Sequence, residues 1–446
     1  MTSEILVMNK SCVAMAADSA ATTYFRGGIK TFRVDKIFPL SFHQPVGIMF
    51  YNIADMTGFP LDVLVKEFSN KLGTKKYETI EEYAEMFFQF INCGQIDGSS
   101  QEKVEIITKE ATSKRICVHM AILCNEIFHE FTNKTAKRIE EKYDSNNGTV
   151  EEIVNQCRRG VVSQILSDIS KKLLPIDEST LNSAIKDLDE IADLEKEIDR
   201  LPDEILKRDL RKRVKEVKRI LANMLLTNGF EEEYTGVVVT GYGRNEFFPS
   251  YVHYKIFGYF FGELRYVKVG EKFSINEEKS ARIEVFAQGD VAESIIFGIS
   301  KEFRDDLMEG FGQALDMITE SIVEAFDGDE KQKKKFIEGN KTIMSGMVKD
   351  VERHLDREYK EPAEIAVQFL SKEEIGAFAE SLINITSLRR RVSMDPETVG
   401  GPTDVAIISR GEGFIWVKRK HYFNTELNPY YVNRRGSERN ENKEQS

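Results

Sequence analysis

The sequence predicts an α+β protein, and three observations carry this prediction. First, 41% of the 446 residues are apolar, which is enough to bury a sizeable core. Second, strand-like patterns gather in three separate parts of the chain, residues 1–60, 234–287 and 404–418. Third, the long stretches between these parts have helical periodicity. Runs of strands followed by runs of helices favour α+β over an alternating order, so strands distant in sequence must share a core.

The first strand-like part begins with a hairpin. Residues 5–8 and 12–17 are apolar, and the polar residues between them are typical of a turn. Further short segments follow, each long enough for one strand. They are residues 30–34, 37–40 and 45–51.

Helical patterns take over at Pro60, a residue that favours the first turn of a helix. Apolar residues then recur at helical spacing over residues 61–72. Thr79 and Glu82 have the spacing of a capping box, which predicts the start of a second helix.

Residues 101–232 are highly charged and have the pattern of helices almost throughout. Within them, residues 186–220 alternate in charge sign and are interrupted by Pro202. This pattern predicts an exposed helical hairpin supported by i,i+4 ion pairs. The Asn-Asn-Gly sequence at 146–148 predicts a break between helices.

Strand patterns return at residue 234 and alternate once more with helices. A second helical part spans 291–385 and contains a charged, glycine-bearing break at 327–340. The polar tail 434–446 is predicted to be disordered. A turn at 410–413 predicts that the last two strands form a hairpin. The strands predicted in this half of the chain are 234–240, 251–260, 264–269, 283–287, 404–409 and 414–418.

Composition and charge argue against several classes of protein. The 62 basic residues against 74 acidic residues give a net charge of −12, which argues against a general nucleic-acid-binding surface. No apolar run approaches the roughly 18 residues that a membrane-spanning helix needs. Glu4 and Lys10 interrupt the stretch that would be apolar in a signal peptide, so we expect a cytoplasmic protein.

The cysteines predict neither disulfides nor a metal site. Their odd and low count fits a reduced protein. Cys117 and Cys124, with His119 and His129 nearby, are the best metal candidates, but a helix separates residues seven apart by about 10 Å. A zinc–sulfur bond is only about 2.3 Å long, so we assign both thiols to the buried side of a helix. The five cysteines are Cys12, Cys93, Cys117, Cys124 and Cys157.

Three residues near the N-terminus have the chemistry of nucleophilic catalysis. Thr2 follows the initiator methionine, Asp18 ends an apolar strand, and Lys36 stands between apolar neighbours. Removal of Met1 would give Thr2 a free α-amine, a group whose usual pKa of about 7.7–8.0 leaves an appreciable fraction neutral. That amine can accept the proton of the Thr2 hydroxyl. A buried lysine would hold positive charge near the nucleophile, and a buried aspartate would orient the lysine.

Each of these residues taken singly also has a structural explanation. Threonine is common at position 2, an aspartate at a strand end is often a turn former, and a lysine between apolar residues often extends its ammonium to the surface. The spacing of Thr2, Asp18 and Lys36 therefore decides between the two explanations.

This spacing resembles that of the catalytic β-subunits of the proteasome family, including the simple bacterial two-component ring protease. In that family the mature chain begins with threonine, and an Ala-Ala-Asp or Ala-Gly-Asp sequence ends the second strand. Thr2 and Asp18 are sixteen residues apart, as in the family. Asp18 and Lys36 are eighteen apart, which implies a two-residue loop insertion. The resemblance implies that Thr2 is nucleophile and general base, and that Asp18 and Lys36 support it.

The resemblance also implies residues of a substrate pocket. Tyr51 or Asn52 stands where the family has a glycine whose backbone N–H serves the oxyanion hole, and any residue except proline keeps that donor. Met49 falls where the family lines its specificity pocket, although an ordinary core methionine explains it equally well.

Two later segments match the family less closely. Gly289 lies in a segment where the family has a Gly-Ser-Gly turn beside the nucleophile, and Gln288 stands in place of the serine. Asp395 precedes the pair at 400–401 much as a family aspartate precedes a Gly-Gly pair, although an Asp-Pro sequence at a helix end is the simpler explanation.

The resemblance implies one proteasome-like domain that spans residues 1–446, built as a four-layer αββα sandwich of the N-terminal nucleophile (Ntn) hydrolases. The implied core segments are 1–95, 234–299 and 366–425. The remaining parts are helical insertions at 96–233 and 300–365 and a tail at 426–446.

The activity implied is hydrolysis of amide bonds, with peptides or proteins as the first expected substrates, through an acyl-Thr2 intermediate. It needs no metal and no organic cofactor. The resemblance also implies a homo-oligomer, because family members assemble through their helical layers. The helical insertions offer a surface for a protein partner, and a ring-shaped ATPase is such a partner by analogy. No nucleic acid or membrane partner is expected.

Three alternatives stay open at this point. The chain could be a non-catalytic proteasome-like scaffold, which Tyr51 and Gln288 favour and the joint presence of Thr2, Asp18 and Lys36 opposes. It could be an amidase of small molecules. The helical segment 100–232 could instead be the functional part, as a regulatory module.

Overall fold

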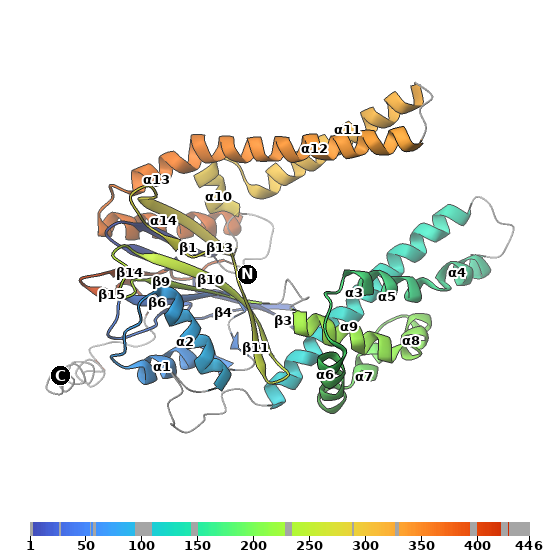
Figure 1. Cartoon of the computed structure of the whole chain (residues 1–446), viewed down its shortest axis with the longest axis horizontal. Helices are drawn as coiled ribbons and strands as arrows, with labels where there is room; N and C mark the ends of the chain where they lie inside the picture. The colour runs from blue at the N-terminus through green and yellow to red at the C-terminus, as the bar shows by residue number, and fades with distance from the viewer. Residues whose placement is uncertain are drawn as a thin grey trace. The chain divides into compact units, whose positions relative to one another are not determined.

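The computed structural model has antiparallel sheets and many helices, which confirms the α+β class (Figure 1). The chain forms two compact units, Met1–Ile37 with Ser274–Ser446, called unit 1, and Phe38–Phe273, called unit 2. Both units draw on segments predicted as core and on segments predicted as insertions. The structure describes residues 3–25, 28–53, 55–56, 59–93, 109–143, 150–227, 234–287, 290–325, 330–392, 399–420 and 427.

Unit 1 contains a five-stranded antiparallel sheet with the order β13-β1-β2-β14-β15. Strands β1 and β2 form the hairpin predicted at 5–8 and 12–17, and strands β14 and β15 form the hairpin predicted around the turn at 410–413. Both predictions are confirmed. The strands are β1 (Ser3–Asn9), β2 (Val13–Ala17), β13 (Ala281–Ala287), β14 (Asp404–Ser409) and β15 (Gly413–Lys418).

One face of this sheet is covered by helices of the same unit. In β1, Ile5 and Val7 pack with Ala379, Leu382 and Ile383 of one long helix, α14. Leu6 and its even-numbered neighbours lie on the opposite face, because side chains alternate along a strand. The helices of unit 1 are α10 (Asp290–Phe297), α11 (Lys301–Ala325), α12 (Glu330–Leu355), a π-helical turn (Asp356–Lys360), α13 (Glu361–Val367) and α14 (Lys372–Val392).

The predicted break at 327–340 is shorter in the structure, because α12 already begins at Glu330. Asn340 lies inside α12, where its side-chain amide donates to the carbonyl oxygen of Leu315 (3.3 Å) and to Thr319 Oγ1 (2.8 Å) on α11. This residue therefore joins two helices rather than ending one. Unit 1 also contains a two-stranded ribbon, β3 (Ala20–Phe25) with β4 (Gly28–Arg33), of which only the second strand was predicted.

Unit 2 contains the second sheet, with the order β11-β10-β9-β6-β5 and β12 paired to β10. Two helices, α1 (Leu61–Leu72) and α2 (Ile80–Cys93), cover one face of it, where Phe68 and Phe87 pack edge to face at 5.3 Å between ring centroids. The strands of this sheet are β5 (Ile37–Pro39), β6 (Val46–Asn52), β9 (Thr235–Gly241), β10 (Ser250–Phe260), β11 (Glu263–Lys268) and β12 (Phe273–Ser274), and a separate two-stranded ribbon is formed by β7 (Asp55–Met56) and β8 (Phe59–Pro60).

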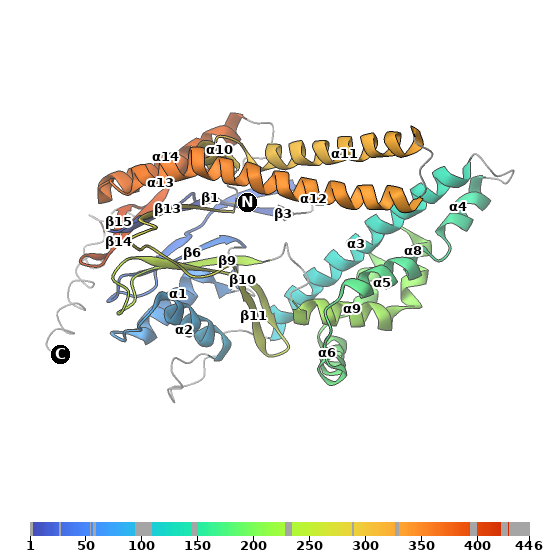
Figure 2. The same ribbon diagram turned by 45° about the horizontal axis from the view of Figure 1, so that its top comes forward.

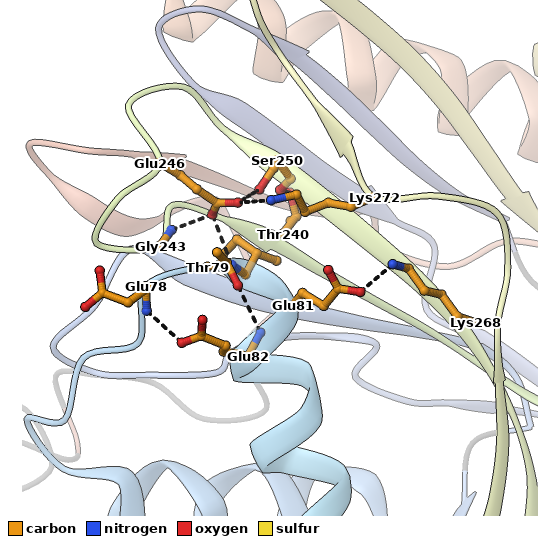
Figure 3. A network of polar contacts seen from close by, with 11 residues as sticks. Glu78, Thr79, Glu81, Glu82, Thr240, Gly243, Glu246, Ser250, Lys268 and Lys272 are labelled. Carbon is orange, nitrogen blue, oxygen red and sulfur yellow. Dashed lines mark hydrogen bonds and ion pairs between the residues drawn. The ribbon is translucent and has the colours of Figure 1, made fainter.

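The start of α2 is held by two carboxylates (Figure 3). Thr79 Oγ1 accepts the N–H of Glu82 at 3.3 Å, which confirms this half of the predicted capping box. The Glu82 carboxylate accepts the N–H of Glu78 at 2.9 Å. Glu246 comes from the loop after β9 and accepts from the backbone of Ile80 (3.0 Å), among other donors. Those other donors are Gly243 N (2.8 Å), Ser250 Oγ (2.8 Å) and Lys272 Nζ (2.9 Å).

Replacing Glu246 by alanine is expected to lower the free energy of unfolding by about 3 kcal/mol, because several donors lose a charged acceptor. Urea-induced unfolding measures this change. Glu246→Gln keeps one oxygen acceptor, so its free energy of unfolding should fall by less. The matched control is Glu78→Ala. The Glu78 side chain is 42% exposed, so its removal should change the free energy of unfolding by less than about 0.5 kcal/mol. Equal losses in Glu246→Ala and Glu78→Ala would contradict the prediction.

The helices between α2 and β9 share a second hydrophobic core, to which Phe257 and Phe260 of β10 also belong. The exposed helical hairpin predicted for 186–220 is wrong. Aspartates at 177, 193 and 203 each cap a new helix, so the segment is broken into short helices whose apolar sides are buried. After α2, the helices of unit 2 are α3 (Lys109–Tyr143), α4 (Val150–Arg158), α5 (Val161–Lys172), α6 (Glu178–Ile191), α7 (Leu194–Asp199), α8 (Glu204–Arg211) and α9 (Val214–Thr227).

His119 is fully buried on α3, on the same helix as Cys117 and Cys124. Its ring packs edge-on against Phe260 at 5.3 Å between centroids, and Nδ1 donates to the carbonyl oxygen of Arg115 at 2.8 Å. Burial lowers the pKa of His119 to about 4.

The buried His119 should make the protein sensitive to acid. In the unfolded state the pKa of His119 would be near 6.5, so below that pH the unfolded state binds a proton that the folded state does not bind. The stability that is present above pH 6.5 is therefore lost as the pH falls toward 4. We expect a loss of about 2 kcal/mol between pH 7 and pH 5 from this residue. Urea unfolding at both pH values should show a smaller difference for His119→Gln. The control is His129→Gln, because His129 is exposed on the same helix, and this variant should lose as much stability between the two pH values as the wild type. If His119→Gln also lost as much stability as the wild type, the assignment would be contradicted.

The predicted helix break at 146–148 and the predicted disordered tail lie outside the described residues. Within the described part of the chain, no helix combines the length and the apolarity that crossing a membrane requires.

Candidate functional site

A buried carboxylate, Asp18, organises the start of the first sheet. Asp18 follows β2 directly and is 2% exposed. Because β1 and β2 are paired with Glu4 opposite Ala17, Asp18 comes to lie beside Ser3. The Asp18 N–H donates to the Ser3 carbonyl oxygen (3.2 Å), and the Ser3 N–H donates to Asp18 Oδ1 (3.0 Å). The residue that follows Thr2 is thus held at both its backbone groups by Asp18.

The second oxygen of the Asp18 carboxylate binds two more backbone groups. Oδ2 accepts the N–H of Ala20 (3.0 Å) and the N–H of Gly400 (2.9 Å). The backbone that follows Asp18 also binds Gly400 directly, because the N–H groups of Ser19 and Ala20 donate to the Gly400 carbonyl oxygen at 3.2 and 3.1 Å. Asp18 is therefore fixed by the backbone on both sides, as an acceptor should be if it is to orient another group.

Lys36 supplies the cation of this cluster, which is defined by Glu4, Asp18 and Lys36. Its Nζ lies 2.5 Å from Asp18 Oδ1 and 3.3 Å from Glu4 Oε1, and the Lys36 side chain is 4% exposed. The structure thus brings together Asp18 and Lys36, two of the residues that sequence spacing selected. Buried charges are tolerated when they are paired in this way.

Glu4 is the member of the cluster that the sequence analysis missed as a site residue. It is completely buried in β1, opposite Ala17 on one side and Phe286 on the other. One signal could have found it. Ile5 and Val7 predict one buried face for β1, and the apolar Leu6 predicts that the alternate face is buried as well, so a charge at Glu4 needs a buried partner.

The backbone across from Ser3 is unusual. Ala287 ends β13 opposite Ser3 and has a φ of 61°, a left-handed conformation that is costly for a residue with a side chain. Just beyond it, Nη2 of Arg390 on α14 donates to both oxygens of Asp290 at 2.9 and 2.8 Å, an ion pair that ties α14 to the start of α10.

Tyr51 and Met49 belong to unit 2 and lie on the face of its sheet opposite α1 and α2. Met49 is fully buried. The Tyr51 hydroxyl is 2.6 Å from Nε2 of His253, and its ring covers Gly236, where a Cβ would approach to 2.1 Å. Burial, followed by the charge of Lys255, lowers the pKa of His253 to about 4.

The Tyr51–His253 contact was not foreseen, because the two residues are 202 positions apart. Three sequence-predicted site residues, Thr2, Gly289 and Asp395, lie outside the described residues.

Comparisons with known proteins add little to this geometry. No family model matches the chain, and neither does any curated protein. Among solved structures, three of the matches are to Anbu proteins. A Gly-1 mutant of Anbu from Hyphomicrobium sp. strain MC1 is 9% identical, with 98% of this chain and 96% of that chain covered and a TM-score of 0.28. Anbu, described as an ancestral beta-subunit, from Yersinia bercovieri is 9% identical, with 98% and 95% covered and a TM-score of 0.27.

The third structure, Anbu from Hyphomicrobium sp. strain MC1 in another crystal form, is 8% identical, with 98% and 96% covered and a TM-score of 0.30. TM-scores this low do not establish a shared fold. The chemistry of the chain must therefore be argued from its own residues.

Proposed function

We propose that the chain is a threonine-type N-terminal nucleophile hydrolase that cleaves amide bonds, with peptide bonds as the first substrate class. One observation carries the proposal. A buried ammonium, Lys36, contacts a buried carboxylate, Asp18, and that carboxylate also binds the backbone of Ser3, the residue bonded to Thr2. A hydroxyl, an ammonium and a carboxylate are the groups that this chemistry needs.

The mechanism begins with removal of Met1, which frees the α-amine of Thr2. The amine takes the proton of the Thr2 hydroxyl while the oxygen attacks the amide carbonyl carbon. The tetrahedral intermediate collapses when the amine returns the proton to the leaving nitrogen, which leaves an ester on Thr2. Water then gives a proton to the amine and attacks the carbonyl carbon of the ester. The bond to the Thr2 oxygen breaks as the amine passes that proton to the oxygen, so the acid product leaves and Thr2 is regenerated. Lys36 supplies positive charge for the alkoxide that develops, and Asp18 holds Lys36 in place.

The remaining site assignments belong to the same proposal. Backbone N–H groups near Tyr51 and Gly289 would stabilise the oxyanion, Met49 would line the substrate pocket, and Asp395 would support Thr2. No step needs a metal or an organic cofactor.

The architecture and setting implied by the family resemblance are part of the proposal as well. We expect one proteasome-like domain with a four-layer αββα arrangement and helical insertions, which forms a homo-oligomer in the cytoplasm. The insertions would bind a protein partner.

A substrate panel tests the proposal. The untagged full chain is incubated with fluorogenic peptide amides and with small-molecule amides, and Thr2→Ala is the matched control. Hydrolysis of peptide amides that is absent from Thr2→Ala supports the proposal. Hydrolysis confined to small amides would make the chain a small-molecule amidase. An inactive wild type that never acylates would point to the non-catalytic scaffold.

A further inference from the structure

The face of the unit 1 sheet that carries Glu4 holds a second buried carboxylate, Asp404. Glu4 and Asp404 are paired with the same residue of β2, Ala17, from its two sides. Residues paired directly across neighbouring strands point to the same face of a sheet, so the two carboxylates lie in one row with the small side chain of Ala17 between them. Neighbouring strands are about 4.8 Å apart, which puts the two backbones about 10 Å apart. Asp404 is 3% exposed and therefore needs a cation as a partner.

Lys420 supplies that cation. It follows β15, which lies beside β14 in both views (Figure 1 and Figure 2). The Lys420 N–H donates to Asp404 Oδ1 at 2.8 Å, and the Lys420 ammonium contacts Asp404 Oδ2. The Lys420 side chain is 16% exposed. Because Asp404 is fixed in an inner strand of the sheet and both its oxygens bind one residue, the ammonium of Lys420 has a defined place.

The same ammonium binds Asp35, the residue that precedes Lys36. Lys420 Nζ lies 2.8 Å from Asp35 Oδ1, and Nη2 of Arg419 lies 3.7 Å from Asp35 Oδ2. Both oxygens of Asp35 therefore face the two residues that follow β15. A contact that only secured the end of β15 would need Asp404 alone. The contact with Asp35 connects Lys420 to the segment that carries Lys36.

The residue before Asp35 is held as well. The Val34 N–H donates to the carbonyl oxygen of Ser19 at 2.9 Å, and Ser19 directly follows Asp18. A lysine has a long and flexible side chain, so the place of its ammonium depends on the backbone that carries it. With Val34 and Asp35 both tied to the sheet of unit 1, the backbone that leads into Lys36 is fixed.

We propose that Lys420 is a positioning residue for the amide hydrolysis, and that it acts through Asp35 to hold Lys36 where the Lys36 ammonium meets Asp18. The inference rests on the proposed function, in which Lys36 supplies charge to the reacting Thr2. A displacement of about 1 Å in a catalytic site can cost about a hundredfold in rate. Because Lys36 acts on the reacting oxygen and not on substrate binding, the loss should appear in kcat rather than in KM.

Asp35→Asn of the full chain tests the proposal. It removes the charge that Lys420 holds but keeps the shape of the side chain, and kcat should fall roughly tenfold with KM unchanged. Asp35 is 38% exposed, so urea unfolding should show little change. Asp35→Glu keeps the carboxylate and should recover most of the rate. An unchanged kcat in Asp35→Asn would overturn the proposal.

The matched control is Glu380→Gln. Lys418 of β15 contacts Glu380 of α14, so this variant breaks an ion pair of the same kind. Lys418 is paired with Val405, whose side chain packs among the residues that contact α14, so the pair lies on the opposite face of the sheet from Glu4. Glu380→Gln should keep the wild-type kcat. An equal fall in the control and in Asp35→Asn would show a general structural effect and overturn the proposal.

The accessibility of Lys36 gives a readout that does not depend on hydrolysis. Brief treatment with acetic anhydride labels exposed lysines, and mass spectrometry of peptides measures the extent at each position. Lys36 is 4% exposed and should react slowly in the wild type and in Glu380→Gln. Asp35→Asn should raise its labelling at least about threefold, because the segment opens more often. Unchanged labelling would overturn the proposal. Raised labelling in a chain that hydrolyses no amide would support the positioning of Lys36 and refute the hydrolase function alone.

A combined variant tests Lys420 itself. Lys420→Met alone would leave the buried Asp404 without its ammonium, so it is made together with Asp404→Asn, which removes that charge. This pair of changes should reproduce the lower kcat and the raised labelling of Asp35→Asn. Adding Asp35→Asn to it should cause no further fall, because the contact is already absent. A further fall would show that Asp35 acts through another group, such as Arg419, and would overturn the role of Lys420.

Discussion

Replacing Thr2 by alanine is expected to reduce amide hydrolysis by at least about a thousandfold. The variant keeps the α-amine, Asp18 and Lys36 but has no oxygen with which to form the acyl intermediate. The measurement is the initial rate of hydrolysis of the best substrate in the panel, with covalent labelling by an epoxyketone or a β-lactone as a second readout. Both readouts should disappear together.

Thr2→Ser is the control for this change. It keeps both the hydroxyl and the small residue that favours removal of Met1, so its rate should stay within about tenfold of the wild type. A Thr2→Ala protein as active as the wild type would show that another residue carries the chemistry. Loss of activity in both variants would point to a steric role of the threonine methyl group instead.

Replacing Lys36 by methionine is expected to cost both activity and stability. The buried carboxylates of Asp18 and Glu4 would lose the ammonium that lies 2.5 and 3.3 Å from them, and breaking a buried ion pair from one side costs about 3–5 kcal/mol. Hydrolysis should fall at least about a hundredfold, because the developing alkoxide would lose the positive charge that Lys36 supplies. Urea unfolding and the initial rate measure the two effects.

A double variant separates these two effects. Glu4→Gln removes one of the carboxylates that Lys36 neutralises, so Lys36→Met with Glu4→Gln should be more stable than Lys36→Met alone. Activity should stay lost, because the ammonium is still missing. Recovery of activity together with stability would show that Lys36 acts only as a structural counter-ion.

The sequence was sufficient for the parts of the fold that depend on local pattern. The β1–β2 hairpin follows from two apolar runs around a polar turn, and β14–β15 from a glycine-rich turn between apolar runs. The contact of Asp18 with Lys36 could be anticipated because a buried lysine needs a buried carboxylate and because the family resemblance pairs these two positions.

Other features depend on contacts between distant residues, which a sequence does not display. Asn340 looks like a helix breaker, but its amide finds acceptors on α11, and these offset its low helix propensity. Tyr51 meets His253 only because β6, β9 and β10 are neighbours in one sheet. Glu4 finds its counter-ion in Lys36, which lies 32 residues further along the chain, and no local pattern of the sequence shows that the two side chains meet.

The central claim is that Thr2 becomes a free N-terminal nucleophile, and intact-mass analysis of the untagged protein tests it most directly. The mass is measured before and after treatment with an epoxyketone or a β-lactone that reacts with N-terminal threonine, for the wild type and for Thr2→Ala. The account predicts a wild-type chain that lacks one methionine and gains a single adduct, and a Thr2→Ala chain that gains none. A wild type that keeps Met1, or that loses Met1 and never forms an adduct, would contradict it.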